Sequence, residues 1–132
     1  MPGGYLSLWG INVKILLIQP GEAPRPVTIS GTLESMQQLV GGSIEAVYPF
    51  HEPVALVCND EGKVNNLTPN RVLRHPETGK IYDIIFGTFF LCYAPADSET
   101  FESLSQEQIE RYTEYFECNG KLSLFSLVME VL

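Results

Sequence analysis

Positive charge is scarce in this sequence. Eight lysines and arginines stand against sixteen aspartates and glutamates, which gives a formal net charge of −8 at pH 7. Because phosphate binding needs a positively charged surface, this balance argues against direct nucleic-acid binding. An acidic chain is better suited to approach a basic surface, such as the DNA-binding groove of another protein.

Long apolar runs are missing as well. No run approaches the roughly 20 residues that a membrane-spanning helix needs, so we expect no membrane partner. The N-terminal segment MPGGYLSLWGIN lacks the basic region and the apolar core of a signal peptide. These absences predict a cytoplasmic protein.

Cysteine and histidine are too few to form a recognisable site. The three cysteines are far apart and form no Cys-x-x-Cys pair, which favours reduced thiols over disulfides or a metal site at Cys58, Cys92 and Cys118. Histidine is present at His51, but the dipeptide with Glu52 lacks the second histidine of a zinc-protease helix. We therefore expect no catalytic residue, no metal and no cofactor, and a protein that is not an enzyme.

The apolar residues that are present form short runs of strand length. VKILLIQP (13–20) and PVTIS (26–30) predict a hairpin, because a proline-rich turn separates them. Further strands are expected in SIEAVYPF and at residues 54–58. The most apolar run, KIYDIIFGTFFLCYA (80–94), predicts two short strands or one strand bent at Gly87, with a buried helix as the alternative.

One short segment, GTLESMQQLVGG, has the end residues and the spacing of a helix. The Thr32 hydroxyl is suited to accept a backbone N–H at the start, and Gly41 is suited to end the helix. The apolar stripe consists of Leu33, Met36 and Val40.

A second segment, LSQEQIERYTEYFECNG, predicts a longer helix. Ser105 and Gln108 have the spacing of a capping box, in which each side chain bonds the backbone N–H of the other. The apolar stripe of this helix is expected to be buried and consists of Ile109, Tyr112 and Phe116.

These elements predict the α+β class: a mostly antiparallel sheet with two or three helices packed on one face. A chain of 132 residues suits one domain, so residues 1–12 form an N-terminal arm and residues 13–132 a single domain. That domain includes the apolar tail KLSLFSLVMEVL, which fits a helix or a strand equally well. An apolar tail must be covered, and we therefore expect a homodimer.

The order of several blocks resembles a known family. GGSIEAV, CNDEGK, PNRVLR and IYDIIFGTF follow one another as they do in the family called domain of unknown function 3846, over residues 13–116. Members are small proteins of bacteria, phages and mobile elements, often encoded near antirestriction and other accessory genes. The resemblance implies a phage or mobile-element accessory protein, and it implies no activity, because the family has no assigned catalytic residues.

One polar stretch, NDEGKVNNLTPNRVLRH (59–75), concentrates positive charge and side-chain amides. Arginine and asparagine suit a phosphate, a carboxylate or a nucleobase edge, so this stretch is a candidate binding loop for a small anionic ligand. Its candidate ligand-binding residues are Asn65, Asn66, Asn70, Arg71 and Arg74. The alternative is a solvated connection in which the asparagines form turns and cap backbone groups.

Acidic residues line the second predicted helix. They recur at steps of three and four residues, which places Glu107, Glu110, Glu114 and Glu117 on one exposed face. A row of carboxylates resembles a row of phosphates in sign, so it is a candidate surface for binding a host protein. The alternative is a face that only keeps the protein soluble.

Three functions remain open at this point. The first is a non-enzymatic counter-defence protein of a phage or mobile element that binds a host protein. The second is a homo-oligomeric module that sequesters a nucleotide-like anion in the Asn/Arg-rich loop. The third, an enzyme, requires Cys58, His75 or Asp83 to converge in one pocket.

Overall fold

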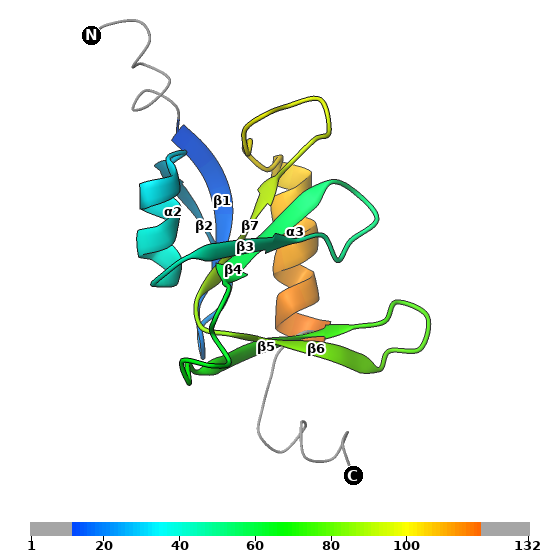
Figure 1. Ribbon diagram of the computed structural model, residues 1–132. Helices are drawn as coiled ribbons and strands as arrows, with labels where there is room; N and C mark the ends of the chain where they lie inside the picture. Colours follow the sequence, from blue (N-terminus) through cyan, green and yellow to red (C-terminus); the bar gives the residue numbers. More distant parts are fainter. Residues whose placement is uncertain (1–11, 120–132) are drawn as a thin grey trace, which may run out of the picture.

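The computed structural model describes residues 12–119, so the predicted arm before Asn12 and the apolar tail lie outside the described residues. This range holds seven strands and two helices, with α2 after the second strand and α3 after the seventh (Figure 1). The strands are β1 (Asn12–Ile18), β2 (Arg25–Ser30), β3 (Ile44–Val47), β4 (Val54–Asn59), β5 (Pro69–Arg74), β6 (Ile81–Phe86) and β7 (Phe89–Tyr93). The helices are α2 (Leu33–Val40) and α3 (Gln106–Glu114), and a π-helical turn, η1 (Tyr115–Asn119), continues α3.

The strands form two antiparallel sheets. Five of them pair in the order β2-β1-β7-β4-β3, and β5 pairs with β6 in a separate two-stranded ribbon. The predicted hairpin is confirmed, because β1 pairs with β2 from Asn12 opposite Ser30 onward. The class is therefore α+β with a mostly antiparallel sheet, as the sequence predicts.

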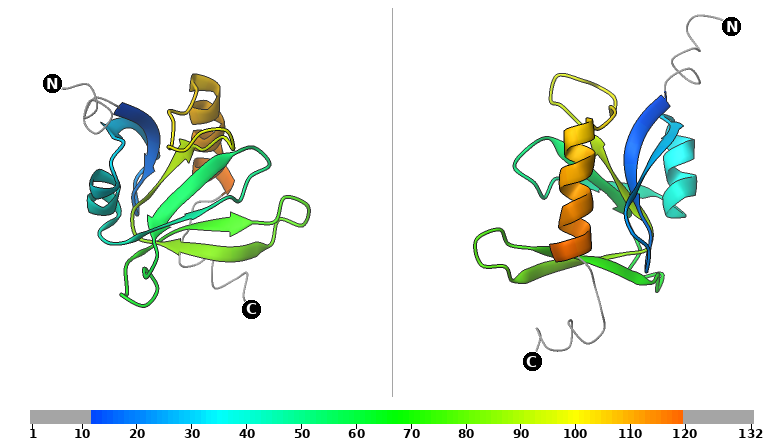
Figure 2. Two further views of the ribbon diagram at one scale, coloured as in Figure 1. Left: turned by 45° about the horizontal axis from the view of Figure 1, so that its top comes forward. Right: turned by 180° about the vertical axis from the view of Figure 1, so that it is seen from behind.

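The two helices lie on opposite faces of the five-stranded sheet, so the prediction that helices pack on one face is wrong. Side chains of β1 alternate between the two faces: Ile15 belongs to the apolar cluster under α2, and Leu16 belongs to the cluster under α3. The ribbon closes the α3 side, across the end of that helix (Figure 2). The central strands are buried on both sides, which explains why their sequences are continuously apolar rather than alternating.

Helix α2 begins and ends where the sequence predicts. The Thr32 side chain accepts a hydrogen bond from the Ser35 N–H at 3.1 Å, and Gly41 has a φ of 82°. Only part of the predicted stripe is buried, since Met36 and Val40 face the sheet while Leu33 remains 58 % exposed. The helix has one face against the sheet, and Leu33 in its first turn lies beyond the edge of that contact.

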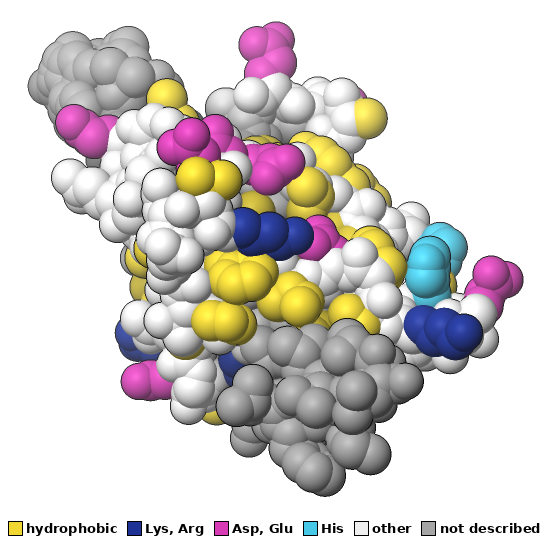
Figure 3. All heavy atoms as spheres, turned by 60° about the horizontal axis from the view of Figure 1, so that its bottom comes forward, with side chains coloured by type: hydrophobic (Ala, Val, Ile, Leu, Met, Phe, Trp, Pro, Cys, Tyr) yellow, Lys and Arg dark blue, Asp and Glu magenta, His cyan; other side chains and the backbone are white. Residues whose placement is uncertain are grey.

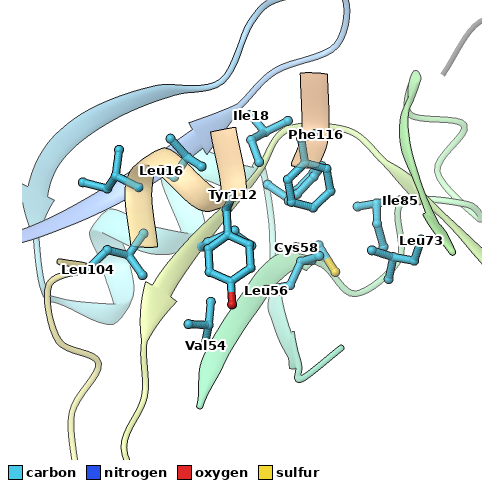
Figure 4. Packing of buried hydrophobic residues seen from close by; sticks show 13 residues of the cluster. Leu16, Ile18, Val54, Leu56, Cys58, Leu73, Ile85, Leu104, Tyr112 and Phe116 are labelled. Atoms are coloured by element: carbon cyan, nitrogen blue, oxygen red, sulfur yellow. The ribbon is translucent and has the colours of Figure 1, made fainter. Parts of the chain in front are cut away.

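Helix α3 also begins as predicted. Ser105 and Gln108 form both hydrogen bonds of the capping box. The predicted stripe is confirmed, and its side chains point into the cluster that also holds Leu56 and Leu73 (Figure 4). The stripe residues Ile109, Tyr112 and Phe116 are at most 4 % exposed.

Gly87 divides the most apolar run into two strands of different sheets. β6 before it pairs in the ribbon, and β7 after it takes the central place between β1 and β4. Gly87 has a φ of 83°, and a Cβ on it would approach Leu67 Cδ1 to 2.7 Å. The chain turns from one sheet into the other at this point because only glycine fits the conformation and the space.

β5 is a strand that the sequence analysis did not predict. It lies inside the polar stretch, where PNRVLR has few apolar residues, yet four of its six residues are buried.

Cys58 and Cys92 are buried free thiols, as expected for reduced cysteines. Between residues 12 and 119, neither helix has the length and apolar character that crossing a membrane requires.

Candidate functional site

The predicted ligand-binding stretch does not lie wholly at the surface. Asn70 is 2 % exposed and Arg71 is 3 % exposed. The Asn70 side-chain amide donates to the carbonyl groups of Ile18 and Gly87, both at 2.9 Å. A binding loop needs donors that a ligand can reach, and the prediction of such a loop is wrong in this respect at Asn70 and Arg71, whose donors are used inside the protein.

Arg71 holds the end of α3 to the rest of the chain. Its Nε donates to the Phe116 carbonyl at 3.1 Å, and its terminal nitrogens donate to the Glu22 carbonyl at 2.6 Å and to Asn70 Oδ1 at 2.8 Å. Burial lowers the pKa of the Arg71 guanidinium, and the negative charge of Glu117 acts in the opposite direction. These contacts show that the Arg71 guanidinium bonds groups of the protein itself and stabilises the fold.

The other three predicted residues are divided between two places. Asn65 and Asn66 are exposed in the turn after β4, where Asn66 has a φ of 57°, as the turn alternative predicts. Arg74 is half-buried at the end of β5 and donates to the Gly79 carbonyl at 2.9 Å. Ligand binding by the five residues stays a prediction, although they do not converge on one surface.

Among the described residues, the positive side chains visible in Figure 3 are dispersed. On the face drawn in Figure 3 they are separated from one another by hydrophobic and acidic side chains. Lys63, one of the basic residues of the stretch, forms an ion pair with Asp83 at 3.2 Å. The described residues of the polar stretch (59–75) therefore form no continuous positively charged patch on the part of this face that Figure 3 shows.

The predicted acidic row is exposed on α3 and η1. Glu107, Glu110, Glu114 and Glu117 all face solvent. Two of them have partners on the same helix: Glu107 pairs with Arg111 at 3.4 Å, and Glu110 accepts a hydrogen bond from Gln106 at 3.0 Å. The structure thus gives the row the exposure that the spacing predicts.

A pocket opens beside this row, between α3, the β3–β4 loop and the turn after β5. We call it the α3 pocket, and its volume is about 520 Å³. Its lining is mainly aromatic and proline side chains, with two arginines, one histidine and one glutamate among them. The lining residues are Pro49, Phe50, His51, Glu52, Arg74, Pro76, Arg111, Tyr112 and Tyr115.

Glu52 is the best-held polar group of the α3 pocket. Its carboxylate accepts hydrogen bonds from Gln108 at 2.8 Å, from Tyr112 and from Arg111. Burial acts to raise the pKa of Glu52, but the bonds from Tyr112, Gln108 and Arg111 together lower it. The carboxylate is therefore ionised at neutral pH, and the loop that carries it is fixed to α3.

Tyr112 contributes to the same network as a neutral phenol. Burial, together with its bond to the Glu52 carboxylate, raises the pKa of Tyr112 well above its usual range. Its ring packs against Phe50 with centroids 4.5 Å apart, and Phe50 meets Tyr115 edge-on at 5.7 Å. The three rings give the pocket a firm aromatic wall.

A second pocket, of about 360 Å³, lies between β3, β4 and β6 and has carboxylates of Glu45, Asp60 and Asp83 in its lining. Cys58 also lines this pocket, and burial followed by the nearby carboxylates raises the pKa of its thiol to about 11. His75 stacks on Tyr82 instead, with ring centroids 4.8 Å apart.

The Cys58 thiol is therefore protonated at neutral pH, without a histidine among the residues lining its pocket to act as a base. Within residues 12–119, no three side chains of His, Cys, Asp or Glu are grouped as a metal site would require.

Comparison with known families gives one finding. The model of the family described as domain of unknown function (DUF3846) matches residues 13–117. The chain belongs to the DUF3846 family. The resemblance predicted from the sequence blocks is therefore confirmed over nearly the same range. Both the α3 pocket and the glutamate row of this DUF3846 protein lie within the matched residues.

Two further comparisons found nothing similar. Neither a curated protein nor a solved structure matches the chain.

Sequence reasoning missed the α3 pocket. Gln108, Arg111 and Tyr112 are spaced by three and four residues, so a helix brings their donors to one side. That spacing was available from the sequence, but their acceptor, Glu52, is 56 residues or more away and belongs to no motif. Only the packing of α3 against the β3–β4 loop joins them.

Proposed function

We propose that this protein is a non-enzymatic accessory protein of a phage or mobile element that binds a host protein and acts in counter-defence. The observation that best supports the proposal is the exposed row of four glutamates on α3 and η1. The origin and the counter-defence role follow from the expectations attached to the family, while the mode of action follows from the charge of the surface.

The row suits a basic surface because its charges are evenly spaced. A helix rises about 1.5 Å per residue, so the ten steps from Glu107 to Glu117 extend over roughly 15 Å. Consecutive glutamates are three or four residues apart, a rise of roughly 4.5–6 Å along the helix axis. This rise is shorter than the Debye length of about 8 Å at physiological salt, so the charges act on a partner together. The net charge of −8 adds a long-range attraction to any basic groove.

The test is capture from a host lysate with a matched pair of variants. In the first, Glu107, Glu110, Glu114 and Glu117 are all changed to glutamine. In the control, four exposed glutamates on other elements are changed in the same way: Glu22, Glu45, Glu77 and Glu99. We expect the wild type and the control to capture one host protein and the row variant to lose it, since both variants have the same net charge.

Two results would contradict the proposal. One is capture of no host protein above background by the wild type. The other is equal loss of capture in both variants, which would assign binding to overall charge rather than to the row. Raising the salt concentration should weaken genuine capture, because the interaction is electrostatic.

The alternative function, sequestration of a nucleotide-like anion, has less geometric support. Two of its five residues are buried, and the other three are divided between the turn after β4 and the α3 pocket. It stays a prediction that a thermal-shift panel of nucleotides checks directly. A ligand present at tenfold over its Kd stabilises the folded state by about 1.4 kcal/mol.

A further inference from the structure

The α3 pocket is not needed for an interaction made by glutamates alone. A volume of about 520 Å³ is in the range that holds a small ligand or one large side chain. Phe50 and Tyr115 in its wall are only partly buried, so ring surface faces the opening. Covering apolar surface of this kind with a partner removes it from water, which favours binding.

The walls of the pocket are held in place before anything binds. Glu52 ties the β3–β4 loop to α3 through Gln108, Tyr112 and Arg111. Phe50, two residues earlier, is clamped against Tyr112 and Tyr115. A preformed pocket binds more tightly than one that must be ordered, because the ordering entropy has already been lost on folding.

The pocket and the glutamate row share a border. Arg111 in the pocket lining pairs both with Glu52 and with Glu107, the first residue of the row. These two carboxylates offset the Arg111 charge, and Glu110 and Glu114 continue the acidic surface along the helix. Arg74, the other cation of the lining, lies on β5 rather than on α3. A partner that covers Glu107 therefore also reaches Arg111 at the edge of the pocket, and positive charge suits such a partner to the row.

We propose that the α3 pocket receives one aromatic or large aliphatic side chain from a basic peptide segment of the partner. Lysine and arginine residues beside that side chain lie along Glu107, Glu110 and Glu114. This inference rests on the proposed function and names the chemistry of the segment that the host protein must present. Buried aromatic anchors surrounded by charged contacts are the usual source of affinity in such interfaces.

The test uses a random library of 12-residue peptides selected for binding to the purified full chain. We expect the selected peptides to share one Trp, Tyr, Phe, Leu or Met together with two or more Lys or Arg. Selected peptides that are basic but have no enriched apolar residue would overturn the inference. So would the selection of acidic or neutral peptides.

Filling the pocket gives a second, independent readout. His51 is exposed and lines the opening, so His51→Trp occupies the space without removing a core side chain. We expect at least a tenfold weaker Kd for a selected peptide, and the same from Pro76→Trp at another lining position. Val64→Trp is the control, because Val64 is 77 % exposed and lines the other pocket. Its Kd should stay within twofold of the wild type.

Circular dichroism of each variant separates a filled pocket from a damaged fold. A folded His51→Trp and a folded Pro76→Trp that both bind the peptide as the wild type does would overturn the inference. The outcomes also separate the two proposals. Host capture that needs the glutamates but survives His51→Trp supports the proposed function and contradicts the pocket inference. Selection of the expected peptides without any host capture contradicts the proposed function and leaves the peptide specificity of the pocket in place.

Discussion

At the scale of single residues, Arg71 joins three separate parts of the chain. Its guanidinium donates to the backbone of η1, to the backbone of the β1–β2 turn and to its neighbour Asn70. A buried cation is costly unless its donors are used, and here the acceptors are backbone and amide oxygens rather than a carboxylate. The residue therefore contributes to stability and ties η1 to the β1–β2 turn.

Replacing Arg71 with methionine tests this role. Methionine keeps most of the buried stem but leaves the Phe116 and Glu22 carbonyl groups without their donor. We expect the free energy of unfolding to fall by about 2–4 kcal/mol, measured by urea denaturation. Arg25→Met is the control, since Arg25 is exposed and its bond to Gln19 is 3.4 Å long. An Arg71→Met protein as stable as the control would contradict the structural role.

Glu52 makes the stability of the fold depend on pH. Its pKa is lowered in the folded protein, so its bonds stabilise the fold above the ordinary glutamate pKa of about 4.3. That contribution is lost as the pH falls through the lower folded value. Because about a third of the side chain is exposed, the effect is smaller than for a fully buried carboxylate.

We therefore expect the stability advantage of the wild type over Glu52→Gln to be full near pH 7 and to shrink as the pH falls from 5 to 3. Urea denaturation at several pH values measures it, with Glu99→Gln at an exposed loop position as the reference. An advantage that is constant over this range, or that grows in acid, is incompatible with a carboxylate held by Tyr112, Gln108 and Arg111.

At the scale of elements, the sequence located what local chemistry determines. Capping residues place the start of both helices, and dense apolar runs place β1, β4 and β7. β5 was not predicted because its buried polar residues, Asn70 and Arg71, form their hydrogen bonds with backbone groups that are distant in the sequence. The α3 pocket escaped it for the same reason, because Glu52 and α3 meet only through the packing of the whole chain.

Gly87, at the turn between β6 and β7, is a position where both the backbone conformation and the available space require glycine. Gly87→Ala adds a Cβ at a φ of 83° and within 2.7 Å of Leu67. We expect a loss of about 2 kcal/mol or more in the free energy of unfolding, since both strain and overpacking apply. Gly21→Ala is the matched control: its φ of 76° is similar, but nothing lies within 4 Å. It should lose only about 1 kcal/mol. Equal losses would show that the space beside Leu67 is unimportant.

At the scale of the whole molecule, the fold has three layers: α2, the five-stranded sheet, and α3 with the ribbon. The acidic row and the α3 pocket share the α3 layer, which concentrates the candidate binding surface on one side. The opposite layer, with α2, contributes no residue to either.

The expected homodimer is a prediction at this scale. Light scattering of the purified chain should give twice the monomer mass of 14.7 kDa. Because the apolar tail motivates the prediction, Leu127→Glu should shift the mass toward the monomer, and Ser126→Glu should not. A monomer mass for the wild type would contradict the predicted homodimer.

The central place of β7 has a consequence for how the chain is made. β1 with β2, and β3 with β4, are hairpins of nearby residues, and among the described strands β7 alone joins these two pairs into one sheet. A ribosome delivers β7 after all of them. Until then the inner edges of β1 and β4 have no neighbour among the strands of residues 12–88, so a nascent chain halted before Phe89 exposes two open strand edges to aggregation and to proteases.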